Sequence, residues 1–87
     1  MERTVLISNK AGIHVRPAAK IADLANKFEA NVLLIKDSTI VNAKSIMDVL
    51  TLAASEGTSI TIRAEGPDQD KAIDELAALI DNKFSEE

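Results

Sequence analysis

Short runs with strand character alternate along this chain with segments of helical spacing, and this alternation restricts the folds that it can adopt. Four runs have the β-branched or alternating pattern typical of strands: residues 4–8, 31–36, 39–42 and 59–64. Only Asp37 and Ser38, residues that favour turns, separate the second run from the third, so the two predict a tight hairpin. A hairpin indicates antiparallel pairing.

The segments between these runs have apolar residues at helical spacing. The first helix is expected over residues 16–27, with Pro17 in its first turn, where the fixed φ of proline suits a helix. A second helix is expected to open at Ser45 and to run to about Ala54. Ser45 and Asp48 have the spacing of a capping box, in which each side chain accepts a hydrogen bond from the other residue's backbone N–H.

Glycine and aspartate mark the remaining helix boundaries. Gly57 is expected to stop the second helix, and Asp68 is expected to cap a third. The third helix has an apolar stripe that is predicted to be buried: Ile73, Leu76, Ala77, Ile80 and Phe84. The order β-α-β-β-α-β-α predicts an α+β fold with helices on one face of a mainly antiparallel sheet. We expect one domain over residues 1–87, packed from about residue 4 to residue 84.

Composition excludes several classes of function. A net charge of -4 and two aromatic residues argue against a nucleic-acid-binding surface. One histidine and no cysteine cannot form a multi-histidine or thiolate metal site, and three distant glycines form no nucleotide loop. The chain lacks an apolar run of ~18 residues and a signal-peptide pattern, so we expect a cytoplasmic protein that does not insert into membranes.

The only histidine lies just before the first predicted helix, in the segment Gly12-Ile13-His14-Val15-Arg16-Pro17-Ala18-Ala19. Unpaired N–H groups and the helix dipole attract phosphate to such a position. A neutral imidazole supplies a nucleophilic nitrogen, and Arg16 neutralises charge during phosphoryl transfer. We therefore predict that His14 and Arg16 are catalytic, with Pro17 and Ala18 at the phosphate-binding helix N-terminus. A purely structural histidine is the alternative.

Residues of the second predicted helix have both structural and functional interpretations. Ser45 is either a helix cap or a site of phosphorylation. The residues favour the cap, because a phosphate on Ser45 would meet the negative charge of Asp48. A short helix cannot bury Ile46, Met47 and Leu50 together, so some of the Ile46-Met47 pair is expected on the surface as a docking patch.

Two motifs together resemble the HPr family, the histidine-containing phosphocarriers of the bacterial phosphoenolpyruvate-dependent phosphotransferase system. They are the segment around His14 and the segment Val41-Asn42-Ala43-Lys44-Ser45-Ile46-Met47. The likeness covers nearly the whole chain in length, element order and motif spacing. It implies the open-faced β-sandwich of the family, in which three helices cover one face of a four-stranded antiparallel sheet.

The resemblance also implies a stoichiometric carrier rather than an enzyme with its own turnover. Enzyme I would phosphorylate Nδ1 of His14 beside the active-site Arg16, and a histidine of a IIA domain would receive the group, with no stored cofactor. Ser45 matches the serine that HPr kinase/phosphorylase modifies in many bacteria. Docking to partners is expected at four residues: Val15, Ile46, Met47 and Leu50. We expect such a carrier to be a monomer.

Two residues depart from the family pattern. Ala11 stands where many members have a small polar residue, which predicts the loss of a hydrogen bond that orients His14. Asp48 stands where Gram-positive members usually have glycine, and we expect it to disfavour phosphorylation of Ser45. Three other functions stay open: a nitrogen-branch carrier of the NPr type, a partner of transcription factors through phosphorylated Ser45, and a small non-catalytic interaction module.

Overall fold

A computed structural model describes residues 1–86 of the chain. The elements in chain order are β1 (Glu2–Leu6), α1 (Val15–Ala25), β2 (Asn31–Lys36), β3 (Thr39–Asn42), α2 (Ile46–Leu50), β4 (Ser59–Glu65), α3 (Gln69–Asp81) and the 3-10 turn η1 (Lys83–Ser85). This is the predicted order of strands and helices. Over residues 1–86, no helix has the length and apolar character that crossing a bilayer requires.

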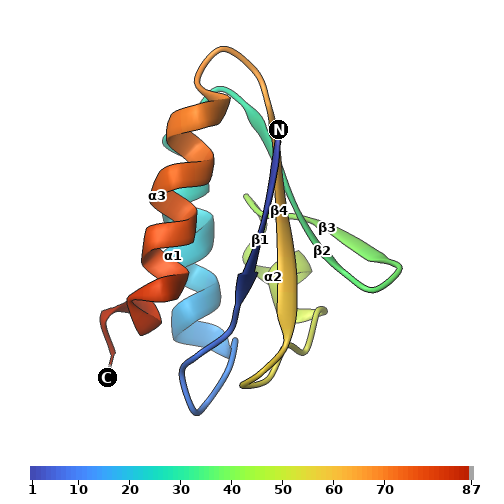
Figure 1. Cartoon of the computed structure of the whole chain (residues 1–87), viewed down its shortest axis with the longest axis vertical. Helices are drawn as coiled ribbons and strands as arrows, with labels where there is room; N and C mark the ends of the chain where they lie inside the picture. Colours follow the sequence, from blue (N-terminus) through green and yellow to red (C-terminus); the bar gives the residue numbers. More distant parts are fainter. Residues whose placement is uncertain (87) are drawn as a thin grey trace.

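The four strands form one antiparallel sheet with the spatial order β1-β4-β2-β3. Val5 lies opposite Ile60, and Leu34 lies opposite Ile62, and all four side chains are buried. Because side chains alternate between the faces of a sheet, one face is apolar and must be covered. Figure 1 shows α1 and α3 against that face. The predicted α+β fold, with its helices on one face of the sheet, is confirmed.

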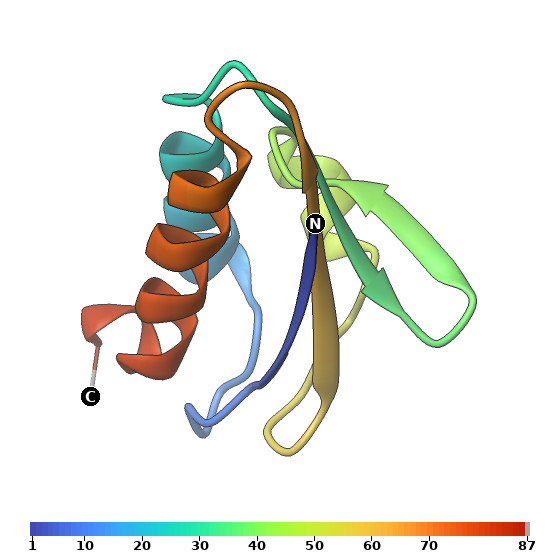
Figure 2. The same ribbon diagram turned by 45° about the horizontal axis from the view of Figure 1, so that its top comes forward.

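The two long helices run in opposite directions against the sheet. Figure 1 shows that the start of α1 and the end of α3 therefore lie at the same end of the molecule. Figure 2 shows the hairpin of β2 and β3 extending away from these two helices. The chain direction thus brings the segment before α1 close to the C-terminal segment.

Side chains from both layers form one continuous core. The predicted stripe of α3 is buried, but Phe84 is not part of that helix. It lies in η1, has a φ of 58°, and is fully buried. Burying a large apolar side chain stabilises a fold by about 1.5–3 kcal/mol, so Phe84 anchors the C-terminal segment to the core.

Helix α1 is slightly shorter than predicted. It begins at Val15 and ends at Ala25, whereas the prediction was residues 16–27. Nδ2 of Asn26 then donates to the carbonyl oxygens of Ala22 and Lys44, at 2.8 and 2.9 Å. The carbonyl of Ala22 also accepts from the N–H of Asn26, so the bond to Lys44 is the one that links the helix end to the segment preceding α2.

The predicted end of α2 near Ala54 is wrong. The helix ends at Leu50, after which the backbone tightens into i→i+3 hydrogen bonds, such as that from Ala53 N–H to Leu50 O. Ala53 has a φ of 49°, in the left-handed region that a right-handed helix cannot continue through. This turn brings the carbonyl of Ala54 to the segment before α1, so a tertiary contact ends the helix.

Gly57 does not stop α2, contrary to the prediction. It lies in the turn before β4 with a φ of 89°, and its N–H donates to the carbonyl of Ile7 at 2.8 Å. The N–H of Ile7 donates in turn to the carbonyl of Thr58 at 2.9 Å. Strand β1 itself occupies residues 2–6 rather than the predicted 4–8.

Asp68 precedes α3, as predicted, but its side chain makes no cap hydrogen bond. Its two carboxylate oxygens instead accept hydrogen bonds from the backbone N–H groups of Glu29 and Ala30, each at 2.9 Å. The bond from Glu29 is the main cause that lowers the pKa of Asp68, with desolvation opposing it. Asp68 therefore ties the loop after α1 to the start of α3.

We predict that Asp68→Asn makes stability less dependent on pH in acid. A carboxyl whose pKa is lowered by folding stabilises the native state at pH values above its ordinary pKa of 3.8. That stabilisation disappears as the pH falls through the lower native value. Thermal unfolding between neutral and strongly acid pH should therefore show a smaller decline in the variant. Asp70→Asn, at an exposed position of the same helix, is the matched control, and an equal decline in wild type and Asp68→Asn would contradict the assignment.

Candidate functional site

His14 is the residue immediately before α1, as predicted. Its backbone is extended, with φ −115° and ψ −163°, and its side chain makes no cap hydrogen bond. The ring therefore does not close the helix N-terminus, and the side chain is 46% exposed. A nucleophilic nitrogen is thus accessible at the positive end of an 11-residue helix.

The first turn of α1 determines which N–H groups face an anion at His14. The N–H of Ala18 donates to the carbonyl of His14 at 2.9 Å, which is the first hydrogen bond within the helix. Pro17 has no N–H, and its side chain is buried together with that of Ala18. The N–H groups of Val15 and Arg16 precede the first intrahelical donor. They are the backbone donors in position to bind phosphoryl oxygens.

A close backbone contact holds the segment before His14. Gly12 has a φ of 68°, and a Cβ atom at this position would lie 2.4 Å from the carbonyl oxygen of Ala54. The same carbonyl accepts a hydrogen bond from the N–H of Ile13 at 2.8 Å. Only glycine fits both the conformation and the space, so the backbone of Gly12 approaches that of Ala54 closely.

Asn9 is a site residue that the sequence reasoning missed. It is buried, and its Nδ2 donates to the carbonyl of Gly12 at 2.8 Å, while Gly12 N–H donates to the carbonyl of Asn9 at 3.1 Å. The predicted consequence of Ala11 was the loss of a side-chain hydrogen bond near His14. Asn9 supplies a hydrogen bond to the backbone of this loop instead. Asparagine is typical of tight turns, but nothing in the local pattern indicated that this one is buried.

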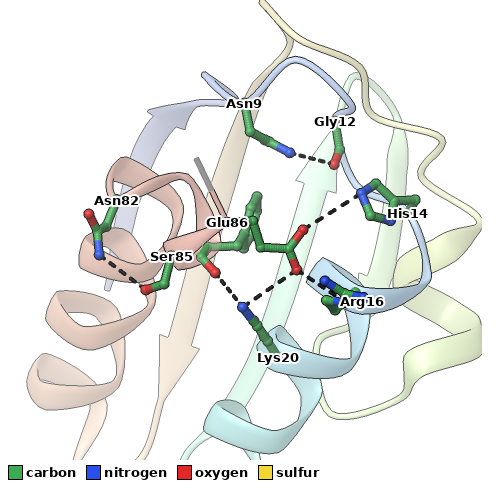
Figure 3. Close-up of polar contacts among 9 residues, drawn as sticks. Asn9, Gly12, His14, Arg16, Lys20, Asn82, Ser85 and Glu86 are labelled. Atoms are coloured by element: carbon green, nitrogen blue, oxygen red, sulfur yellow. Dashed lines mark hydrogen bonds and ion pairs between the residues drawn. The ribbon is translucent and has the colours of Figure 1, made fainter.

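Two cationic side chains extend from α1 beside the ring of His14 (Figure 3). Arg16 is highly exposed, and Lys20 lies one helical turn further along the same face. Between them lies the carboxylate of Glu86. Its Oε1 is 3.9 Å from His14 Nε2, and its Oε2 is 3.8 Å from Arg16 Nε and 3.5 Å from Lys20 Nζ. The spacing of Arg16 and Lys20 signals their shared face, but no sequence pattern placed Glu86 here.

The predicted capping box at α2 is half correct. Oγ of Ser45 accepts a hydrogen bond from the N–H of Asp48 at 3.2 Å. The carboxylate of Asp48 does not bond the N–H of Ser45, which donates to the carbonyl of Asn42. The carboxylate of Asp48 accepts instead from the N–H of Asn42, at 3.4 Å. The turn before α2 satisfies the N–H of Ser45, so Asp48 is directed to the strand end.

The four residues predicted to dock partners differ in exposure. Val15 and Met47 are the most exposed, at 66% and 73%, and Ile46 is partly exposed at 38%. Leu50 packs in part against the core. Because α1 and α2 contact each other, the exposed side chains of Val15, Ile46 and Met47 lie on neighbouring helices.

The chemistry of this arrangement suits a covalently attached phosphoryl group. An exposed imidazole supplies the nucleophile, a helix N-terminus supplies backbone donors, and Arg16 supplies a guanidinium beside the reacting position. Within residues 1–86, the His, Asp and Glu side chains form no group of three or more that could hold a metal ion. A fold and a site of this kind define the class of histidine phosphocarriers.

Comparisons with known proteins identify the family within this class. A family model described as "PTS HPr component phosphorylation site" matches residues 1–82. The chain is 44% identical over 85 residues to the phosphocarrier protein HPr of Treponema pallidum (strain Nichols), covering 98% of this chain and 97% of that protein. It superposes on the crystal structure of HPr-C-His from Thermoanaerobacter tengcongensis with a TM-score of 0.95 and 45% identity, covering 100% and 98% of the two chains. The chain belongs to the HPr family, the phosphocarriers of the phosphotransferase system.

Relatives within this family have different names. The phosphocarrier protein NPr of Shewanella violacea is 40% identical over 86 residues, covering 99% of this chain and 94% of that protein. The crystal structure of an HPr dimer from T. tengcongensis also matches, with a TM-score of 0.78. The family therefore includes carriers named HPr and NPr, and an HPr that forms a dimer in a crystal.

We predict that Asn9→Ala destabilises the protein and slows phosphoryl acceptance. Removing the buried donor leaves the carbonyl of Gly12 without its partner, which costs about 1–3 kcal/mol. The loop before His14 then loses one of its two anchors. Chemical denaturation and the rate of phosphorylation by a charged donor measure the two effects. Asn31→Ala, at an exposed strand position, is the control, and wild-type stability of Asn9→Ala would exclude this role.

Proposed function

We propose that this chain carries phosphoryl groups for sugar transport, from phosphorylated enzyme I to IIA domains, on the imidazole of His14. The observation that supports this most is the exposed ring of His14 at a helix N-terminus, where it makes no capping bond. Partners must reach the ring in two successive reactions, and an exposed ring allows both. In the absence of a stored cofactor, the phosphohistidine itself holds the group.

The transfer needs few protein groups. The bond from phosphorus to the donor breaks as a bond to a ring nitrogen of His14 forms. In the second transfer, that P–N bond breaks as a bond from phosphorus to a histidine of the acceptor forms. Nε2 faces the carboxylate of Glu86, which leaves Nδ1 for the phosphoryl group, as the family resemblance implies. The N–H groups of Val15 and Arg16 and the guanidinium of Arg16 then neutralise the charge on the phosphoryl oxygens.

Partners dock, in this proposal, on the apolar surface of Val15, Ile46 and Met47. Their exposure on two neighbouring helices supports this assignment. Methionine adapts to differently shaped surfaces, which suits a carrier that binds a donor and several acceptors. Leu50 contributes less, because it is partly packed against the core. We also infer a cytoplasmic monomer, since a carrier that presents one small site to several partners needs His14 and the docking residues to stay accessible.

A nitrogen-branch carrier is the second candidate, because the NPr of S. violacea is nearly as similar to this chain as the HPr relative is. The two candidates share the chemistry of His14 and differ in the acceptor. Transfer from the charged protein to a sugar-specific IIA domain supports the first, and transfer only to a nitrogen-branch IIA protein supports the second.

Ser45 is a further proposed site of modification, by HPr kinase/phosphorylase. Its hydroxyl is in a surface turn at the start of α2, where the positive end of the backbone dipoles favours phosphate. Two features oppose the reaction: Oγ is used as a helix cap, and the carboxylate of Asp48 lies in the same turn. We infer that Asp48 makes Ser45 a poorer substrate than a serine followed by glycine at the third position.

We predict that His14→Ala abolishes phosphorylation by phosphoenolpyruvate, magnesium and enzyme I. Wild-type protein should gain a phosphoryl group that is stable in base and labile in acid, as expected for phosphohistidine, and mass spectrometry detects it. Ser45→Ala should gain the group as wild type does. Failure of the wild-type protein to be charged by a competent enzyme I would contradict the proposed function and favour an interaction module.

We also predict that Asp48→Gly increases phosphorylation of Ser45 by HPr kinase/phosphorylase. Removing one nearby like charge changes such an equilibrium by up to about fivefold. The acid-stable phosphate on Ser45 should therefore form faster and to a greater extent in the variant, and Ser45→Ala supplies the blank. An unchanged rate and extent would show that Asp48 does not control this site.

A further inference from the structure

Met47 is the most exposed large apolar residue within residues 1–86, at 73%. The sequence has two methionines and no cysteine, so the thioether of Met47 is one of only two sulfur atoms in the chain. Exposed methionine is readily oxidised to its sulfoxide, and here no thiol competes for the oxidant. The proposed docking role uses the flexible shape of Met47 and leaves the chemistry of its sulfur unused.

Met47 has apolar neighbours that are also exposed. Val15, directly after His14, is 66% exposed at the start of α1, and Ile46 is 38% exposed beside Met47 in α2. Helices α1 and α2 contact each other. A partner that covers this surface must remove the side chain of Met47 from water, because the chain's own residues leave most of it exposed.

The fold does not depend on the side chain of Met47. The buried residue of α2 is Val49, and Leu50 packs in part against the core. The first turn of the helix is held by Ser45, whose Oγ accepts from the N–H of Asp48 at 3.2 Å and whose carbonyl accepts from the N–H of Val49 at 3.0 Å. A polar change at Met47 therefore alters the surface of α2 and leaves its packing intact.

Oxidation of this thioether by a peroxide needs no catalytic group. The sulfur attacks one oxygen of hydrogen peroxide, the O–O bond breaks as the S–O bond forms, and the leaving hydroxide takes the proton of the transferred oxygen to give water. Sulfur thereby loses two electrons, which the peroxide gains. The sulfoxide is polar, so burying it against an apolar partner surface is unfavourable. A dithiol reverses the change: it becomes a disulfide, and the oxygen leaves as water.

We propose that Met47 is a site of reversible oxidation that makes the docking of partner proteins depend on the redox state of the carrier. The inference rests on the proposed function, in which Val15, Ile46 and Met47 form the docking surface. The sulfoxide weakens docking, while the ring of His14 keeps its chemistry. Transfer of phosphoryl groups then slows in the presence of peroxide and recovers when a dithiol reduces the sulfoxide.

The other methionine provides an internal comparison. Met1 is 49% exposed, its ammonium group donates to the carbonyl of Ala64 at 3.1 Å, and its own carbonyl accepts from the N–H of Ala64 at 2.9 Å. Figure 1 shows the N-terminus at the end of the molecule opposite the start of α1. Oxidation of Met1 should therefore leave docking beside His14 unchanged.

The first test treats the full chain with hydrogen peroxide, locates each added oxygen by peptide mass spectrometry, and measures phosphorylation by enzyme I. The KM for the oxidised carrier should rise by about fivefold to tenfold, the usual effect of a lost central contact, with kcat unchanged. Methionine sulfoxide reductase with dithiothreitol should restore the original KM. An unchanged KM with Met47 fully oxidised, or oxidation confined to Met1, would overturn the inference.

Two variants assign the effect to the sulfur of Met47. Met47→Leu stays apolar and has no sulfur, so its KM should be the same before and after peroxide treatment, although Met1 is still oxidised. Met47→Gln has a polar side chain of similar length and should raise the KM without any peroxide. A peroxide-dependent rise in the KM of Met47→Leu would place the sensitive group elsewhere and overturn the assignment.

Charging without a partner protein separates docking from ring chemistry. Phosphoramidate phosphorylates imidazole: its P–N bond breaks as the new P–N bond to the ring forms, and ammonia leaves with the proton that the ring releases. Untreated and oxidised protein should be charged at the same rate, and slower charging of the oxidised form would overturn the docking explanation. Failure of enzyme I to charge the untreated protein contradicts the proposed function itself, whereas equal KM values for both forms contradict only the inference.

Discussion

The contact between Gly12 and the carbonyl of Ala54 is the constraint on which the site depends. The carbonyl accepts a hydrogen bond from Ile13 and leaves no room for a Cβ at Gly12. It joins the loop after α2 to the segment before α1, and Asn9 reinforces that segment from within. With its backbone held on this side, His14 can serve as the N-cap of α1 while its ring extends into solvent.

Helix α1 combines packing and chemistry by using different faces. One face is buried through Ala18, Ile21 and Ala25, which join the core beneath the sheet. The other face carries Arg16 and Lys20, four residues apart, toward the C-terminal segment. The buried face fixes the direction of the helix, so the positive end of its dipole and its two cations surround the same small volume beside His14.

Two expectations from the sequence were wrong for the same reason, a contact between distant segments of the chain. Helical spacing continued to Ala54, yet α2 ends at Leu50 because the following turn must bring Ala54 to Ile13. Asp68 has the position of a helix cap, but its carboxylate bonds the N–H groups of Glu29 and Ala30. In both places a local preference was overruled by a hydrogen bond to a part of the chain that the local pattern does not include.

The sequence by itself determined the element order, the antiparallel hairpin, the exposed part of α2, and the place of His14 before a helix. These features depend on periodicity and turn residues within a few positions of each other, where the backbone has few alternatives. Only the tertiary structure decided that Asn9 is buried against Gly12 and that Glu86 lies against His14, Arg16 and Lys20. Glu86 meets the residues of α1 because α1 and α3 run in opposite directions. Both helices take these directions by packing on one apolar face of the sheet.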